Sequence, residues 1–278
     1  MRKFFLQFAE NVNLVMNLGE IFYDFFSNFL RKKLFPFLFP AFCLGCKCEG
    51  QFLCFRCKAS MRSNEKLTCP ICRRENALGK ICLSCESPVI FLDGLATVFS
   101  FTEQKLLLKC IYSFKYDFIE ELALPLGEML FQTLEKFIFQ PEFKIFTEKI
   151  ILCPVPLHSK RLRFRGFNQS ELLALQTLRK LKSSQNDEAI AEISMVHCLR
   201  RIHFSKPQME LQREERLTNV IGAFDLEEKQ KDVVAESTIF LVDDVATTLS
   251  TLNACAEVLK KAGAKAVFGL VLAHGLQK

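Results

Sequence analysis

Four Cys-x-x-Cys pairs follow one another between residues 43 and 85, and they restrict the fold of this region more than any other feature of the sequence. The pairs are Cys43 with Cys46, Cys54 with Cys57, Cys69 with Cys72, and Cys82 with Cys85. Two thiolates that are separated by two residues in a tight turn can bind one metal ion, and two such turns complete a tetrahedral four-thiolate site. Eight ligands therefore predict a double zinc ribbon that holds two structural zinc ions.

A disulfide framework and a redox Cys-x-x-Cys are the alternatives to a zinc site. A disulfide framework requires an oxidising compartment, and a redox Cys-x-x-Cys requires one pair beside a strand-to-helix turn. Consecutive pairs are expected to share a metal because their connecting loops are shorter, although crossed pairing is also geometrically possible. Cys48 lies outside the pattern and is predicted to be a free thiol. Four further cysteines stand among apolar neighbours and are predicted to be small buried thiols: Cys110, Cys153, Cys198 and Cys255.

The composition excludes several classes of protein. Half of the 278 residues are hydrophobic and 24% are charged, which excludes an intrinsically disordered chain, a collagen-like chain and a coiled coil. The formal charge of +6 permits an anionic partner without requiring one. The cysteine module can also be interpreted as a docking surface for nucleic acid or protein.

Two apolar stretches near the N-terminus do not predict export or a membrane span. The first begins at Met1, is interrupted early by Glu10 and Asn11, and has no small-residue cleavage site after it. The second, residues 34–44, contains two prolines and is shorter than the roughly 20 residues of a spanning helix. Residues 17–33 predict an amphipathic helix that packs on the protein itself or contacts a membrane surface or a partner. We therefore expect a cytoplasmic protein without a transmembrane segment, with peripheral attachment to the inner membrane left open.

The predicted organisation has three parts: an amphipathic N-terminal segment (1–42), the cysteine-rich zinc-binding module (43–87) and an α/β domain (88–278). In the last part, apolar runs alternate with helical stretches, which predicts a parallel sheet with helices on its faces. Strands are expected at Leu95–Phe101, Ile150–Val155, Thr238–Val242 and Ala266–Ala273, and helices at Phe118–Phe139, Gln169–Lys182 and Ser250–Ala262.

An acidic pair follows the expected strand at Thr238–Val242. Asp243 and Asp244 come first, and a hydroxyl-rich loop and a helix follow them; the hydroxyls belong to Thr247, Thr248, Ser250 and Thr251. Hydroxyls and backbone N–H groups at a helix start suit a phosphate, and carboxylates suit the vicinal hydroxyls of a ribose. Together they predict a site for a phosphoribosyl group at the carboxyl edge of the sheet. A Mg²⁺ site of a receiver-like domain and a purely structural loop cap are the alternatives.

This segment resembles the phosphoribosyl diphosphate (PRPP) loop of type I phosphoribosyltransferases. Two further segments, Val155–Gln169 and Gln208–Phe224, narrow the resemblance to one family. It is the ComF family of competence-associated proteins, in its longer, GntX-like form with a cysteine-rich N-terminus. The resemblance covers about residues 35–275 and implies a type I phosphoribosyltransferase-like α/β domain that binds PRPP with Mg²⁺. It implies that Asp243 and Asp244 contact the ribose hydroxyls.

The same resemblance extends to the residues around the phosphates. The loop hydroxyls at 247, 248, 250 and 251 are implied to hold the 5-phosphate, and Arg165 and Gly166 are implied to lie on the diphosphate side. Residues 208–219 resemble the loop and return helix that close over the pocket. Leu249 stands where the family has glycine, and a side chain there is expected to hinder a positive φ or to crowd the ligand.

A basic cluster precedes the helix expected at 169–182. Its members are Lys160, Arg161, Arg163 and Arg165. Arginine side chains clamp phosphate oxygens through paired N–H donors, so the cluster can serve single-stranded DNA or a diphosphate; a solvated basic face is the alternative. Asn168 and Glu171 have the spacing of a capping box.

Two functions follow from this interpretation. Similarity to ComF proteins implies a factor in DNA uptake and natural transformation that binds PRPP and single-stranded DNA and works with proteins of the competence machinery. The alternative is a phosphoribosyltransferase that moves phosphoribose from PRPP to a base or an amine. No acceptor can be identified, so enzymatic activity is left open. None of the four histidines (His158, His197, His203 and His274) has the neighbours expected of a general base.

Overall fold

The structure, a computed structural model, describes residues 40–61, 67–100, 104–146, 149–184, 192–203 and 222–275. The chain divides into two compact units, residues 1–54 and 55–278. The amphipathic helix expected at 17–33 and the pocket-closing segment expected at 208–219 lie outside the described residues. Within the described part of the chain, no helix has the length and the apolar character that crossing a membrane requires.

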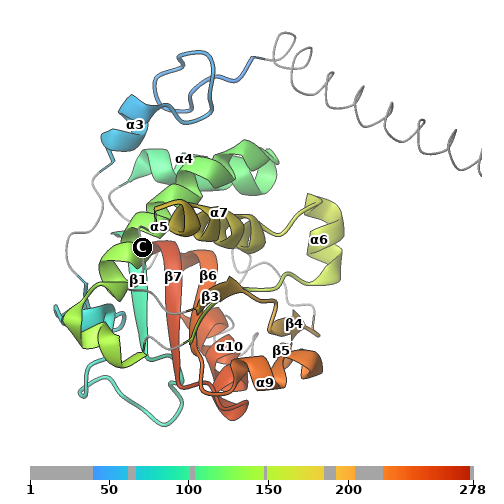
Figure 1. Cartoon of the computed structure of the whole chain (residues 1–278). Coiled ribbons are helices and arrows are strands. Elements are labelled where there is room, and N and C mark those ends of the chain that lie inside the picture. The colour runs from blue at the N-terminus through green and yellow to red at the C-terminus, as the bar shows by residue number, and fades with distance from the viewer. Residues whose placement is uncertain are drawn as a thin grey trace, which may run out of the picture. The chain divides into compact units, whose positions relative to one another are not determined.

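A five-stranded parallel sheet forms the centre of the second unit (Figure 1), in the order β1-β7-β6-β2-β3. These strands are β1 (Gly94–Ser100), β2 (Lys149–Pro154), β3 (Glu192–Met195), β6 (Thr238–Ala246) and β7 (Ala266–His274). A separate antiparallel pair joins β4 (Leu199–Arg201) to β5 (Phe224–Leu226). Every residue of β7 is buried, as is typical of a parallel strand with both faces covered. The expected α/β fold with a parallel sheet is therefore confirmed.

Helices cover both faces of the sheet. The helices of the described residues are α3 (Phe55–Ala59), α4 (Lys105–Tyr116), α5 (Ala123–Ile138), α6 (Ser159–Arg165), α7 (Gln169–Ser184), α9 (Lys231–Val234) and α10 (Ser250–Lys261). Short 3-10 turns are η2 (Ala77–Gly79), η3 (Glu120–Leu122), η4 (Pro141–Phe146) and η6 (Glu228–Gln230). Both α5 and α7 pack against the sheet, and α10 packs against β6 and β7 from the other side (Figure 1).

The core shows why the chain forms these layers. Successive residues of a strand point to opposite faces, so Phe240 lies on one face of β6 while Ile239 and Leu241 lie on the other. Phe240 stacks on its register partner Phe268 at 5.6 Å between ring centroids, and Phe137 of α5 meets both rings edge-on. Ile239 and Leu241 belong instead to the apolar cluster that includes residues of α10. The four cysteines predicted to be buried thiols are all buried.

Two elements have bounds that differ from those expected. The helix expected at about Phe118–Phe139 is present but begins later: Phe118 has a φ of 56°, and α5 begins only at Ala123. A left-handed residue cannot continue a right-handed helix, so the chain turns there. The strand expected to end at Val242 continues through the acidic pair to Ala246, because β7 pairs with it as far as His274.

Candidate functional site

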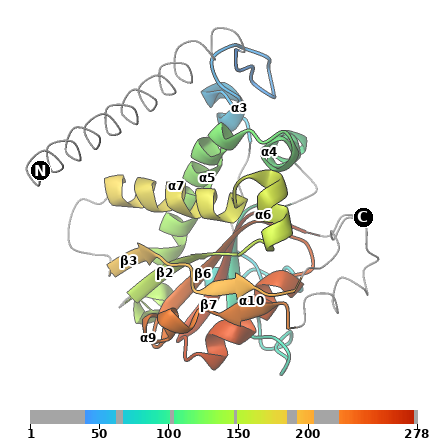
Figure 2. The same cartoon turned by 90° about the vertical axis from the view of Figure 1, so that its right-hand side faces the viewer.

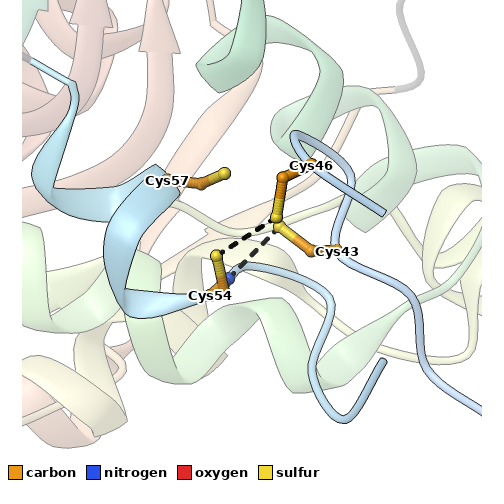
Figure 3. A group of neighbouring side chains, drawn as sticks. All are labelled: Cys43, Cys46, Cys54 and Cys57. Carbon is orange, nitrogen blue, oxygen red and sulfur yellow. Dashed lines mark hydrogen bonds between the residues drawn. The ribbon is translucent and has the colours of Figure 1, made fainter. Parts of the chain in front are cut away.

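The first four cysteines converge on one point. The thiol sulfurs of Cys43, Cys46, Cys54 and Cys57 all lie within 4.8 Å of one another, and Figure 3 shows these side chains together. The Cys46 and Cys54 sulfurs are 3.6 Å apart, close to the edge of about 3.8 Å that Zn–S bonds of about 2.3 Å give a tetrahedron. Four thiolates at this spacing fit a zinc ion.

The second group repeats this arrangement with Cys69, Cys72, Cys82 and Cys85, whose sulfurs also lie within 4.8 Å of one another. Both groups combine consecutive pairs, as expected. Their turns are built alike: the N–H groups of Cys43 and Cys69 donate to the carbonyls of Cys48 and Arg74, each at 2.8 Å. The residues after the second cysteine, Lys47 and Arg73, have φ of 65° and 68°. The two halves of the module therefore share one local backbone design.

Cys48 and Arg74 occupy equivalent positions in these two turns. Arg74 donates from Nε to the Cys72 sulfur at 3.4 Å, and this bond lowers the pKa of Cys72 to about 6, which favours the thiolate that binds metal. Among the described residues Cys48 forms no disulfide, as expected, but its sulfur lies 3.4 Å from that of Cys46. The hydrogen bond with Cys46 raises the pKa of Cys48 to about 12. Cys48 thus adds a fifth thiol beside the first group.

The acidic pair lies near the carboxyl end of β6, against two helices. The Ser170 hydroxyl at the start of α7 donates to Asp243 Oδ1 at 3.0 Å, and the backbone N–H of Asp244 donates to the same oxygen at 2.9 Å. Lys115, in the last turn of α4, places its ammonium 2.8 Å from Asp244 Oδ2. Burial, and next the charge of Asp244, raises the pKa of Asp243 to about 7. Two carboxylates held this close favour a cation or hydroxyl donors beside them.

Lys115 and Ser170 were missed by the sequence analysis, because nothing in their local sequence links them to the acidic pair. A further polar group stands next to them. Gln169 is 2% exposed, and within the described part of the chain its side-chain Nε2 has no hydrogen-bond partner. A buried polar nitrogen without a partner costs free energy unless a ligand or water satisfies it. The start of α7 therefore has capacity for a polar ligand near Asp243.

The hydroxyl loop after β6 has the local geometry of a helix start. The hydroxyls of Thr248 and Ser250 are 2.6 Å apart, and residues 247–251 are half-buried. Leu249 immediately precedes α10 with a φ of 62°, and its carbonyl accepts from the N–H of Asn253 at 2.8 Å. A side chain at 249 therefore does not exclude a positive φ, because the loop has this conformation with leucine in place; that leucine crowds the ligand stays a prediction. Thr247 and Thr248 lie in the loop after β6, and Ser250 and Thr251 begin α10.

The basic cluster forms the helix α6, between β2 and α7. His158 caps its start by accepting from the N–H of Lys160 at 3.2 Å, and Gly166 ends it with a φ of 81°. Gly166 is thus a helix C-cap. Arg165 contacts the ring of Tyr116 at 5.4 Å, and no residue of α6 is buried. The cluster is therefore a solvent-facing row of cations.

Arg201, at the end of β4, was not predicted. It adds a positive charge near Arg161, in a partly buried position. Burial, and next the positive charge of Arg161, lowers the pKa of Arg201, and its guanidinium lies 5.2 Å from the ring of Phe224. The paired basic residues Arg200 and Arg201 were a signal that the sequence analysis passed over.

Two smaller expectations concern Asn168 and the histidines. Asn168 Oδ1 caps α7 by accepting from the N–H of Ser170 at 3.1 Å. The Glu171 carboxylate lies 3.3 Å from His197 Nε2. Of the expected capping box, only the hydrogen bond to Asn168 is therefore confirmed. His274 is buried, which lowers its pKa to about 4 and leaves it neutral.

The chain is similar to two known competence proteins, and no family model matches it. It is 32% identical over 116 residues to "Competence protein F" of Haemophilus influenzae, which covers 42% of this chain and 46% of that protein. The match thus spans less than half the length of that relative. It is 25% identical over 219 residues to "Competence protein ComFC" of Bacillus subtilis, which covers 76% of this chain and 79% of the relative. Together with the cysteine module and the motif order described above, these two relatives support an assignment of the chain to the ComF family.

Proposed function

We propose that the chain binds PRPP together with Mg²⁺ at the carboxyl edge of the sheet. The observation that carries the proposal is the order of groups at the end of β6: two consecutive carboxylates, a half-buried hydroxyl loop and the first turn of α10. Ligands of open α/β sheets bind at this edge. The partial positive charge and the N–H groups of a helix start favour a phosphate.

Each group has a defined task in this proposal. Asp243 and Asp244 accept hydrogen bonds from the ribose hydroxyls, and the hydroxyls of residues 247–251 with the backbone at the start of α10 hold the 5-phosphate. Mg²⁺, when bound, neutralises charge on the diphosphate. Lys115 keeps Asp244 compensated in the absence of ligand. The diphosphate side is assigned to Arg165 and Gly166, as in the resemblance.

We propose further that the chain acts in DNA uptake during natural transformation, with single-stranded DNA and competence-machinery proteins as partners. The names of both relatives support the process. The exposed cations of α6 support DNA, because an unpaired strand is held mainly through its phosphates.

Titration calorimetry of PRPP with Mg²⁺ tests the pocket independently of any acceptor. The double variant Asp243→Asn with Asp244→Asn is expected to bind at least about 10-fold more weakly, since hydrogen bonds to a charged group contribute about 1.5–3 kcal/mol. Glu257→Gln is the matched control, because this carboxylate lies on α10 but pairs with Lys261 at 2.7 Å. No heat from the wild-type protein, or equal affinity in the double variant, contradicts the proposal.

A phosphoribosyltransferase is the second candidate, and one observation favours it. A carboxyl group whose pKa is about 7, such as that of Asp243, is suited to accept or release a proton near neutral pH. Diphosphate release in the presence of a base or amine, lost in Asp243→Asn, would support transfer in addition to binding.

A further inference from the structure

Four aromatic side chains are exposed where α4 and α6 lie together, as Figure 2 shows for the two helices. They are Tyr112, Tyr116, Phe118 and Phe164, with exposed fractions of 56%, 38%, 43% and 74%. We call these four side chains the aromatic surface. Exposing so much ring area to water is unfavourable, and contiguous exposed apolar area on a protein usually marks a binding site.

The rings are arranged as touching pairs. Tyr112 and Tyr116, one turn apart on α4, have centroids 4.9 Å apart. Phe118 and Phe164 meet edge-on at 5.9 Å, and this contact joins the end of α4 to α6. The Arg165 guanidinium lies 5.4 Å from the Tyr116 ring. The aromatic surface therefore consists of two pairs of rings, and a cation contacts one of these pairs.

Phe118 adds an independent observation. Its φ of 56° lies in the left-handed region, which a bulky residue other than glycine rarely adopts. Burial does not explain this conformation, because the ring is 43% exposed. Strained residues persist where the surrounding structure imposes them, and they cluster at binding sites. The left-handed backbone of Phe118 therefore places the exposed Phe118 ring beside that of Phe164.

The helix α6 gives the second half of the argument. Its sequence alternates cations with apolar side chains, from Lys160 and Arg161 through Leu162 and Arg163 to Phe164 and Arg165. No residue of α6 is buried, so core packing does not account for this sequence. The helix thus presents one ring, that of Phe164, and four positive charges on a single element that has no buried residue.

We propose that the aromatic surface stacks the unpaired bases of single-stranded DNA, while the cations of α6 hold the phosphates between them. The inference rests on the proposed DNA-binding function and adds the base-contacting half of the interface. Every base has a π-face, so aromatic rings bind a single strand with little sequence preference. Flat rings beside arginines can contact both the bases and the phosphates of an unpaired strand, whereas a duplex would hide the base faces in its stack.

Fluorescence anisotropy with a labelled oligothymidine and an abasic phosphate chain of equal length separates the two halves of this interface. The wild-type protein is expected to bind oligothymidine more tightly than the abasic chain. Replacing Phe118→Gly together with Phe164→Ala is expected to reduce affinity for oligothymidine by about 5- to 100-fold for each ring. The affinity of this double variant for the abasic chain should stay unchanged, and so should the salt dependence of its binding, because every cation is retained.

Two controls guard against a folding defect. Glycine relieves the left-handed strain at position 118, so Phe118→Gly alone should unfold at no lower temperature than the wild-type protein while still losing affinity. Phe139→Ala removes a ring that is 58% exposed at the end of α5, beyond which η4 leads to the start of β2 and so to the opposite edge of the sheet. This control should bind oligothymidine like the wild-type protein.

The possible failures are distinguishable. If the wild-type protein binds both chains equally, or if the double variant keeps its preference for bases, the aromatic surface does not stack them, and DNA binding through the cations still stands. If the wild-type protein binds neither chain, the DNA-binding function is wrong and this inference falls with it. Binding to anionic vesicles instead would reassign the surface to a membrane.

Discussion

Leu249 offers the sharpest test of the loop that we assign to phosphate. It has a φ of 62° immediately before α10, and its side chain packs against the apolar cluster beneath that helix. Two opposing effects therefore meet at this residue: strain in the backbone and burial of the side chain. Replacing leucine with alanine and, separately, with glycine distinguishes them, since both variants remove the packing atoms beyond Cβ and only glycine relieves the strain.

The difference between the two variants can be worked out from the backbone alone. A left-handed residue with a Cβ costs about 1–2 kcal/mol. Glycine avoids this cost, but it loses about 0.5–1 kcal/mol more conformational free energy than alanine on folding. Leu249→Gly should therefore be more stable than Leu249→Ala by about 0.7 kcal/mol, the midpoint of a range of about 0–1.5 kcal/mol. For a chain of this size the unfolding midpoint should differ by about 1–4 °C.

Thermal unfolding of the zinc-loaded variants, followed by circular dichroism, measures this difference. Calorimetry with PRPP adds the functional readout: Leu249→Gly should bind more tightly than Leu249→Ala, because a loop without a side chain lets the phosphate approach the backbone N–H groups. If alanine proves as stable as glycine at this position, residue 249 does not hold the left-handed conformation. If the two variants bind PRPP equally, the loop does not hold the phosphate.

Three further outcomes are expected. Purified protein should carry about two equivalents of zinc, and Cys69→Ser should lose about one of them and unfold the second half of the module, as elemental analysis and proteolysis would show. Replacing Arg161, Arg163 and Arg165 with glutamine should reduce the slope of log affinity for single-stranded DNA against log salt by up to about 2, at about 0.7 for each phosphate contact. The folded chain holds the Asp243 proton up to about pH 7, whereas the unfolded chain releases it near its ordinary pKa of 3.8. The contribution of the Asp243 carboxyl to the free energy of unfolding should therefore fall as the pH rises from about 4 to about 7. The variant Asp243→Asn should not show this dependence on pH. PRPP affinity should rise over the upper part of the same range, and a flat pH profile would contradict the raised pKa.

The parallel sheet was predictable because strands buried on both faces leave continuous apolar runs, as at 150–155 and 266–273. Shorter or interrupted elements left weaker signals. β4 and β5 have three residues each, too few for a periodic pattern, and they are recognised as strands only by their pairing with one another. The helix α4 does carry helical spacing, since Leu107, Ile111 and Phe114 are buried together, and it was overlooked in favour of one longer helix further along the chain.

The candidate site was predictable where chemistry is concentrated in a short segment. Cysteine spacing predicted both four-cysteine groups, which could hold zinc, and the segment 243–251 contains the carboxylates and hydroxyls together. The groups that complete the site come from distant parts of the chain: Lys115 from α4, Ser170 from α7 and Arg201 from β4. An ordinary lysine or serine gives no local sign of the carboxylate that it will meet. Only the packing of the helices over the sheet edge selects these residues.

Backbone conformation explains what sequence patterns omit at these sites. In the described part of the chain, six residues other than glycine have positive φ: Lys47, Arg73, Leu78, Phe118, Glu236 and Leu249. Two of them follow paired cysteines of the four-cysteine groups, one lies in the aromatic surface, and one ends the loop between β6 and α10. Local propensity disfavours this conformation for every one of these side chains, so it persists only because the surrounding fold imposes it. At position 249 the sequence shows a departure from the family's glycine, whereas the structure shows the turn that a glycine would make. The fold therefore preserves the shape of the loop even where the residue that most easily forms it is absent.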